Sequence, residues 1–197
     1  MRTCKKEGFC VIQRTEKELR VSAEQLRKVL WDYTDIKYLD IVKVLEHKMP
    51  EAFNGFRYEI VEPYELPDRE AEMNPCDFCI RIQEPIYLKA MNGDGHCRFT
   101  LAHELGHFFL HRTQTLAFGR KAIDGNIPTW RNSEWQADTF ARNFLAPYSM
   151  TRGMCAQEIE ALFGVSRSVA NIVAGTDNKT NHNHPKDPFS QMTFAFF

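Results

Sequence analysis

The chain has 197 residues, of which 43% are hydrophobic and 26% are charged. This length and composition are ordinary for a globular protein with one well-formed core, or one core with a small appendage. The formal net charge is −1 and no block of five basic residues occurs, so nothing suggests direct nucleic-acid binding. No run of eighteen apolar residues is present, which argues against a membrane-spanning helix or a membrane partner.

The start of the chain and its cysteines indicate a reducing compartment. Residues 1–20 carry early positive charge with no apolar stretch behind it, which is not the pattern of a secretory signal. The six cysteines are too sparse for a disulfide framework, so we expect free thiols in a cytosolic protein. Cys76 and Cys79 form a C-x-x-C pair, but no second pair completes a structural zinc site. We interpret them as two thiols.

Hydrophobic periodicity predicts an α+β fold in which helices come first. An amphipathic helix is predicted over residues 15–34, inside an N-terminal helical extension of residues 1–37. The core is predicted to span residues 38–150. It opens with a short helix over residues 38–49, which Pro50 is expected to end.

Two segments of the core alternate apolar and charged residues and are predicted as strands of a small antiparallel sheet. The first is residues 56–66. The second is residues 77–90, where the alternation continues through Ile86 and Leu88. The sequence N-G-D-G at 92–95 is a strong turn signal, and the pattern after it is helical.

Beyond a long loop predicted over residues 113–132, the chain is expected to be helical. A strong helix is predicted over residues 133–147, with Ser133 as N-cap and Pro147 as its stop.

The C-terminal part, residues 151–175, has the pattern of a helix-turn-helix, with two short helices broken at Gly164. Its second helix offers only Arg167 as a basic residue, so we favour packing or substrate docking over DNA contact. Residues 176–197 form a polar and then aromatic tail, predicted to be loosely ordered.

The sequence His103-Glu104-Leu-Gly-His107 has the form H-E-x-x-H. Residues four apart lie on one helical face, so two imidazoles can grip one ion from the same side. Zinc accepts histidine nitrogen, and a catalytic zinc takes three protein ligands and a water, which Glu104 could reach. The apolar residues of this helix fall on the opposite face, and Gly106 beside the histidines suggests close approach of another backbone. The alternative is a helix that merely carries exposed histidines.

A candidate for the third ligand lies in the next strong helix. Glu134 and Asp138 are again four residues apart on one face. Glu134 would bind the metal, and Asp138 would accept a hydrogen bond from a ligand histidine and fix its tautomer. Two helices would then supply a His₂Glu set. The alternative is a solvated acidic face.

His111 continues the four-residue spacing but is not predicted as a ligand. It lies about 12 Å along a straight helix from His103, too far for both to bind one ion. We interpret it as a pocket or surface residue.

These parts predict metal-assisted hydrolysis of an amide. Zinc would polarise the carbonyl and acidify its water, and Glu104 would act as the catalytic base. A second stabiliser of the oxyanion is needed, and the sequence leaves its identity open. The candidates are Tyr148, His111, Arg142, His182 and His184.

The segments around both motifs resemble the ImmA/IrrE family of bacterial metallo-endopeptidases, over roughly residues 38–170. The resemblance implies a zincin-like core of gluzincin type, with His103, His107 and Glu134 as ligands of Zn²⁺, or of Mn²⁺. It also implies a bacterial, cytoplasmic enzyme that cleaves a helix-turn-helix transcriptional repressor and so derepresses stress or mobile-element genes. Residues 1–37 and the tail match nothing in the family pattern.

Two other readings compete with the peptidase. The chain could be a non-catalytic regulator or antitoxin-like binding module that keeps the fold, although the intact Glu104 argues against this. Direct DNA binding through residues 157–174 is the weaker rival.

Overall fold

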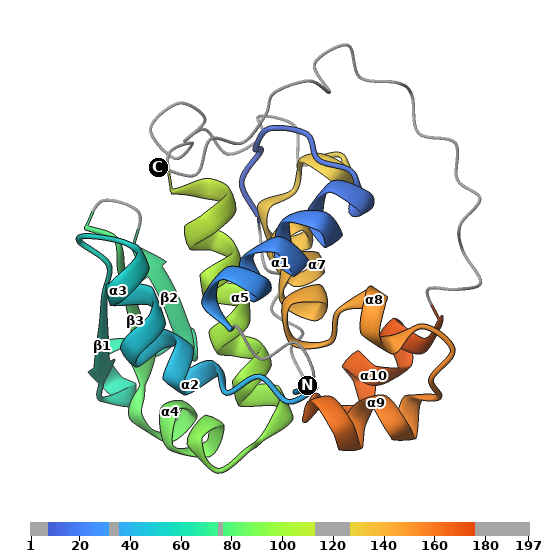
Figure 1. Cartoon of the computed structure of the whole chain (residues 1–197). Coiled ribbons are helices and arrows are strands. Elements are labelled where there is room, and N and C mark those ends of the chain that lie inside the picture. The colour runs from blue at the N-terminus through green and yellow to red at the C-terminus, as the bar shows by residue number, and fades with distance from the viewer. Residues whose placement is uncertain (1–7, 32–35, 75–76, 113–126, 176–197) are drawn as a thin grey trace.

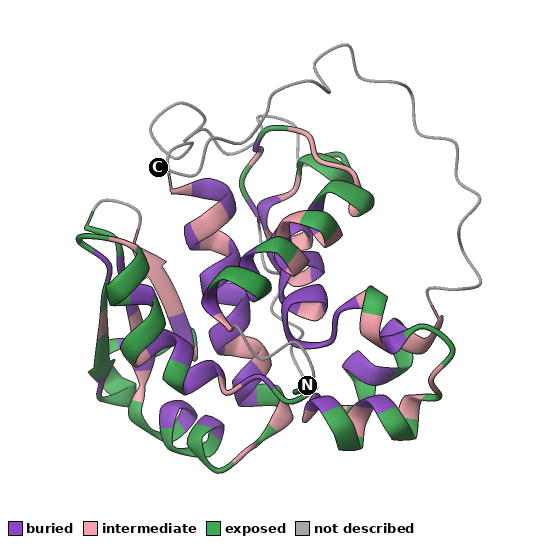
Figure 2. Ribbon diagram, in the orientation of Figure 1, coloured by how far each residue is buried: buried purple, intermediate pink, exposed green. Residues whose placement is uncertain are grey.

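The computed structural model describes residues 8–31, 36–74, 77–112 and 127–175. Its centre is the long helix α5 (Gly95–His111), which lies between a small sheet on one side and helices α1 and α7 on the other (Figure 1). The Asp94 side chain accepts a hydrogen bond from the Cys97 N–H at 2.8 Å and so caps the start of α5. Figure 2 shows buried residues along most of α5, as expected for a helix covered from both sides.

The sheet consists of β1 (Arg57–Val61), β2 (Ala71–Asn74) and β3 (Cys79–Gln83) in the order β1-β3-β2. The α+β class is therefore confirmed, but the prediction of an antiparallel sheet is wrong. β2 pairs antiparallel with β3, whereas β1 pairs parallel with it. After β1 the chain passes through a 3-10 turn, η2 (Pro63–Glu65), and forms β2 on the far side of β3, so β1 cannot join β3 as a hairpin.

The second predicted strand is only half correct. After β3 the chain turns into the helix α4 (Glu84–Met91), with Pro85 in its first turn. Pro85 needs no N–H partner at that position and presets the helical backbone angle. Ile86, Tyr87 and Ala90 are buried, whereas Leu88 is 48% exposed. The buried positions follow helical spacing, so the apparent alternation through Ile86 and Leu88 was misleading.

The segment before β1 is a continuous helical stretch that Pro50 does not end. It comprises α2 (Ile41–Lys43), the π-helical turn η1 (Val44–Lys48) and α3 (Met49–Ala52). The widened turn η1 shifts the hydrogen-bond register immediately before Pro50, so the missing N–H interrupts the helix without terminating it.

The predicted N-terminal helix is present as α1 (Glu16–Leu30), which packs against α7 (Ser133–Leu145). Thr15 and Glu18 form a capping box at its start. The buried Arg27 of α1 donates hydrogen bonds to the carbonyl oxygens of Phe144 and Leu145, at 2.8 and 3.2 Å. Arg27 therefore satisfies carbonyls left open at the end of α7.

Helix α7 begins as predicted, but its N-cap is Asn132 rather than Ser133. The Asn132 side chain accepts hydrogen bonds from the N–H groups of Glu134 and Trp135 at 2.9 and 3.1 Å. After α7 come α8 (Tyr148–Thr151), α9 (Ala156–Phe163) and α10 (Arg167–Ala174). The predicted break is confirmed, because Gly164 ends α9 with a left-handed φ of +60°. No helix in the described ranges is long and apolar enough to cross a membrane.

The α9–α10 turn is docked on the start of α5 through Arg98. This fully buried arginine donates to the carbonyl oxygens of Phe163 at 2.9 Å and Leu39 at 2.7 Å, and also to that of Gly164. Its guanidinium stacks 3.9 Å from the centre of the Tyr38 ring. The first turn of α5, the helix that carries the H-E-x-x-H motif, is thus held by Leu39 before the sheet and by the α9–α10 turn after α7.

Replacing Arg98 with methionine should lower the free energy of unfolding by about 3 kcal/mol, because buried carbonyls lose their donors. Arg167→Met is the matched control, since Arg167 is half-exposed and pairs with Glu160 on the surface. Chemical denaturation of both variants measures the difference. Equal losses would show that Arg98 does not hold the turn.

Candidate metal centre

The two histidines of the H-E-x-x-H motif point to one spot beside α5. Their Nε2 atoms lie 3.0 Å apart, and the side chain of His103 is almost completely buried. One helical turn separates the residues, so the rings stack along the helix and meet edge to face. The sequence spacing is therefore realised as a convergent pair of nitrogen donors.

Glu134 brings a carboxylate from α7 to the same spot. Its two oxygens lie 3.3 Å from the Nε2 atoms of His103 and His107. Donor atoms of all three side chains lie within 4.8 Å of one another. Two ligands at about 2.0–2.1 Å from a tetrahedral ion lie about 3.3 Å apart, so this spacing fits one zinc-sized cation. The structure thus brings together the three residues predicted as ligands.

The charge of Glu134 also agrees with a role as a metal ligand. Burial by itself would raise the pKa of its carboxyl group. Hydrogen bonds and charge interactions with His103 and His107 outweigh that effect and hold the pKa well below its usual range. Glu134 is therefore an anion in the folded protein, as a metal ligand must be.

The close crossing of α5 and α7 makes this convergence possible. A Cβ atom on Gly106 would lie 3.1 Å from both the Cα and the carbonyl oxygen of Ala137. Both neighbouring atoms belong to the α7 backbone, so they cannot move aside as a flexible side chain would. The predicted reason for Gly106, close approach of another backbone, is confirmed.

His103 is oriented by a partner on α7. Its Nδ1 lies 2.7 Å from Oδ1 of Asp138. A carboxylate can only accept, so the Nδ1–H donates, and Nε2 is the nitrogen whose lone pair would face a bound metal. Asp138 occupies the place predicted for a residue that fixes the tautomer of a ligand; that role in metal binding remains a prediction.

His111 lies away from the converging donors and is buried between α5 and α7. Its Nδ1 lies 3.1 Å from Nδ1 of His107, and its Nε2 lies 3.1 Å from Oε1 of Gln136. Burial, with a smaller contribution from His107, lowers the pKa of His111 to about 3, so the ring is neutral. Sequence reasoning missed Gln136 entirely, because a lone glutamine inside a helix carries no periodic or spacing signal.

Glu104, the predicted base, is nearly buried next to His103 on α5. Within the described ranges its carboxylate forms no hydrogen bond or ion pair. A buried carboxylate without a protein partner is unusual and is typical of functional sites.

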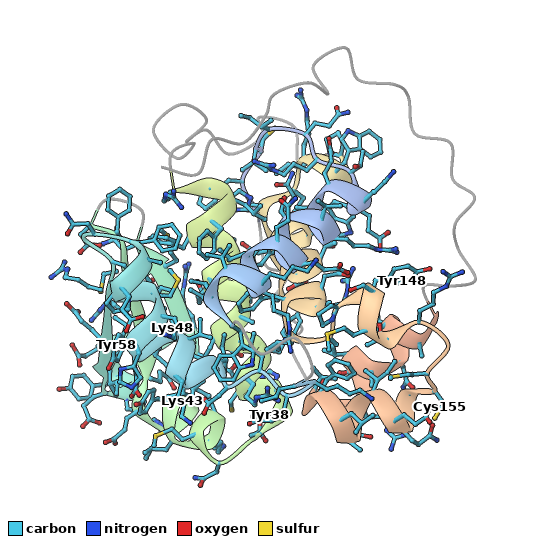
Figure 3. All side chains as sticks on the ribbon, viewed as in Figure 1. Tyr38, Lys43, Lys48, Tyr58, Tyr148 and Cys155 are labelled. Atoms are coloured by element: carbon cyan, nitrogen blue, oxygen red, sulfur yellow. The ribbon has the colours of Figure 1, made fainter. Side chains whose placement is uncertain are left out.

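The residues predicted as candidates for stabilising the oxyanion differ in where they lie relative to the converging donors. His111 has both ring nitrogens engaged. Tyr148, labelled in Figure 3, follows the end of α7, about 16 Å beyond Glu134 by helix rise. Its ring packs against the guanidinium group of Arg20, which lies 4.4 Å from the ring centre. Arg142 lies about 12 Å along α7 from Glu134 and donates to Thr139 Oγ1 at 3.2 Å. His182 and His184, like Cys76 of the C-x-x-C pair, fall outside the described residues.

The family model described as IrrE N-terminal-like domain, Peptidase_M78, matches residues 54–173. The chain belongs to this family. The match confirms the ImmA/IrrE resemblance, and the family is one of metallopeptidases. No curated protein and no solved structure matches the chain.

Widening the contact between the two helices should separate the donors. Gly106→Val places methyl groups against the backbone of Ala137, which should cost about 1–3 kcal/mol of stability and move Glu134 away from the histidines. Gly175→Val is the control, because no atom of the described residues lies within 4 Å of a Cβ placed on Gly175. Urea denaturation and zinc titration measure the two effects, and unchanged zinc affinity in a folded Gly106→Val variant would contradict the expectation.

Removing the partner of His103 should weaken metal binding without abolishing it. Asp138→Asn keeps the shape but replaces the carboxylate, and we expect about 10–100-fold lower zinc affinity. Asp77→Asn is the control, since Asp77 pairs with Arg57 at the sheet surface. Competition with a chromogenic chelator measures the affinity, together with the thermal stabilisation that bound zinc confers. Equal affinities in both variants would refute a role for Asp138.

Proposed function

We propose that the protein is a zinc-dependent endopeptidase with a zincin-like site. The observation that carries the proposal is the convergence of His103, His107 and Glu134 in a chain of a metallopeptidase family. Two imidazoles and one carboxylate form the ligand set of several catalytic zinc sites. Mn²⁺ is the alternative metal, since nitrogen and oxygen donors also accept it.

The side chains present can divide the work of amide hydrolysis. When bound, zinc supplies a Lewis acid that polarises a carbonyl group and makes water more acidic. Glu104 would take the proton of the attacking water and deliver it to the leaving amide nitrogen. Asp138 would keep His103 in the tautomer that presents Nε2, so proton transfer and ligand orientation fall to different carboxylates.

A peptide substrate has a suitable strand to pair with. β2 forms the edge of the sheet that packs beside α5, while β1 forms the opposite edge. Just before β2, Glu70 accepts a hydrogen bond from Thr100 Oγ1 at 3.0 Å, and just before β3, Phe78 packs on Phe108. β2 thus runs along the turns of α5 that carry the histidines. In the part of the chain that the structure describes, no strand pairs with its other edge, and an extended peptide could add there.

The substrate we propose is a helix-turn-helix transcriptional repressor in the bacterial cytoplasm. This part of the proposal derives from the family resemblance. Cleavage of such a repressor would relieve repression of stress or mobile-element genes. An endopeptidase suits this role, because one cut between two folded parts inactivates the regulator.

The decisive experiment incubates a helix-turn-helix repressor, chosen from the genes that flank this one, with wild type, Glu104→Gln and chelator-treated protein. We expect one discrete cleavage by wild type, and about 10²–10⁴-fold slower cleavage by Glu104→Gln, because the base is lost while the ligands remain. Zinc content near one per chain in both proteins is the control for an intact site. Cleavage by Glu104→Gln at the wild-type rate would overturn the mechanism.

The same experiment separates the peptidase from a non-catalytic binding module. A module that only captures its partner would hold the repressor intact, with or without Glu104. Formation of a stable complex and absence of any fragment, in the presence of bound zinc, would favour that reading.

A further inference from the structure

A segment near the start of the chain, residues 8–14, lies directly on the stretch that leads into α7. Phe9 and Ser133 exchange two hydrogen bonds, from the Phe9 N–H to Ser133 Oγ at 2.9 Å and from the Ser133 N–H to the Phe9 carbonyl at 3.1 Å. The N–H groups of Val11 and Arg14 donate to the carbonyl oxygens of Arg131 and Trp130, at 2.9 and 3.1 Å. We call residues 8–14 the N-terminal strap.

The strap also packs against the cap of α7. A Cβ atom on Gly8 would lie 2.5 Å from Oδ1 of Asn132, the atom that accepts hydrogen bonds from the N–H groups of Glu134 and Trp135. The absence of a side chain at Gly8 therefore leaves room for the cap. Because Glu134 lies in the first turn of α7, the strap sets the position from which this carboxylate reaches the histidines.

Gln136 connects the strap to the histidines. Its side chain is fully buried, and its Nε2 donates to the carbonyl oxygens of Ile12 and Trp130, each at 2.8 Å. Two carbonyl acceptors require the NH₂ group on that side, which turns Oε1 toward His111 Nε2. The strap therefore supplies one of the two carbonyl groups, with that of Trp130, that fix which way the amide faces.

The orientation of the amide determines the tautomers of both histidines. Oε1 of Gln136 only accepts, so His111 carries its proton on Nε2 and its Nδ1 must accept. The partner of that Nδ1 is Nδ1 of His107, at 3.1 Å, which therefore carries the proton. With a metal bound, His107 would therefore present the lone pair on Nε2, the atom 3.3 Å from Glu134.

We infer that the N-terminal strap is a working part of the metal centre, acting on His107 through the positioning residues Gln136 and His111 and on Glu134 through Asn132. The strap lies outside the residues matched by the family model, 54–173. The inference rests on the proposed metal site but not on peptide hydrolysis, so metal binding tests it independently of any substrate.

Full-length variants test the hydrogen-bonded chain, with zinc affinity and histidine tautomers as readouts. Gln136→Met keeps the length of the side chain and removes the amide, so we expect about tenfold weaker zinc binding. Long-range ¹H–¹⁵N NMR spectra should show a mixture of His107 tautomers in place of one. Asn143→Leu is the matched control, because this buried amide of α7 donates to the carbonyl of Thr139 at 2.8 Å and, among the described residues, to no group of the site.

Two substitutions of His111 distinguish a role in orienting His107 from a merely structural role, because one of them should restore zinc affinity that the other removes. His111→Leu removes the acceptor for the Nδ1–H of His107, and zinc affinity should fall about tenfold or more. In His111→Asn the amide oxygen can take the place of Nδ1, so a large part of the affinity and the single His107 tautomer should return.

The strap itself is tested by Gly8→Ala, which drives a methyl group into Asn132. Gly175→Ala is the control, because a Cβ there meets no described atom within 4 Å. We expect several-fold weaker zinc binding and an altered visible absorption spectrum of the Co²⁺-substituted protein for Gly8→Ala alone. Wild-type zinc affinity and tautomers in folded Gln136→Met and Gly8→Ala proteins would overturn the inference. Failure of the wild type to bind zinc would instead overturn the proposed function.

Discussion

The contact of α5 with the backbone of α7 at Gly106 is the constraint on which the site depends. One helix offers two nitrogen donors and the other offers one carboxylate, and neither helix can complete a ligand set alone. The 3.3 Å spacing between Glu134 and the histidines exists because the helices cross with only a hydrogen atom at Gly106. A side chain of ordinary size there would move the carboxylate outward by more than the tolerance of a zinc site, about 0.2 Å.

The two helices are held at opposite ends by different means, which keeps this crossing in register. Buried arginines act at the ends remote from the ligands: Arg98 ties the first turn of α5 to three carbonyl groups, and Arg27 closes the last turn of α7. Near the ligands the fixation is finer, through Asn132 at the start of α7 and Gln136 one turn later. Gross placement thus depends on charged groups that satisfy many carbonyls, and fine placement depends on neutral amides.

The histidine pair and the Glu134–Asp138 pair could be predicted because each obeys the four-residue spacing of a helix and combines residue types with known metal chemistry. The sheet was harder, since pairing partners depend on contacts distant in sequence. β2 is a four-residue strand between prolines, and α4 continues an apparent strand alternation at Ile86 and Leu88 although Pro85 already stands in the first turn of a helix. Gln136 and the strap gave no signal, because their roles arise from a carbonyl at Ile12 that any residue could provide.

The outer partners of the two histidines differ in charge, and this difference suits the proposed chemistry. His103 faces the carboxylate of Asp138, whereas His107 faces the neutral His111–Gln136 chain. Glu104, Glu134 and Asp138 would already place three carboxylates around a bound dication. A fourth carboxylate behind His107 would add negative charge and weaken the attraction of the site for the developing oxyanion. A neutral acceptor fixes the ring equally well, since it dictates the tautomer by geometry. The hydrogen-bonded pair His111 and Gln136 therefore orients His107 without adding charge. The N-terminal strap helps to hold the Gln136 amide in the orientation that this requires.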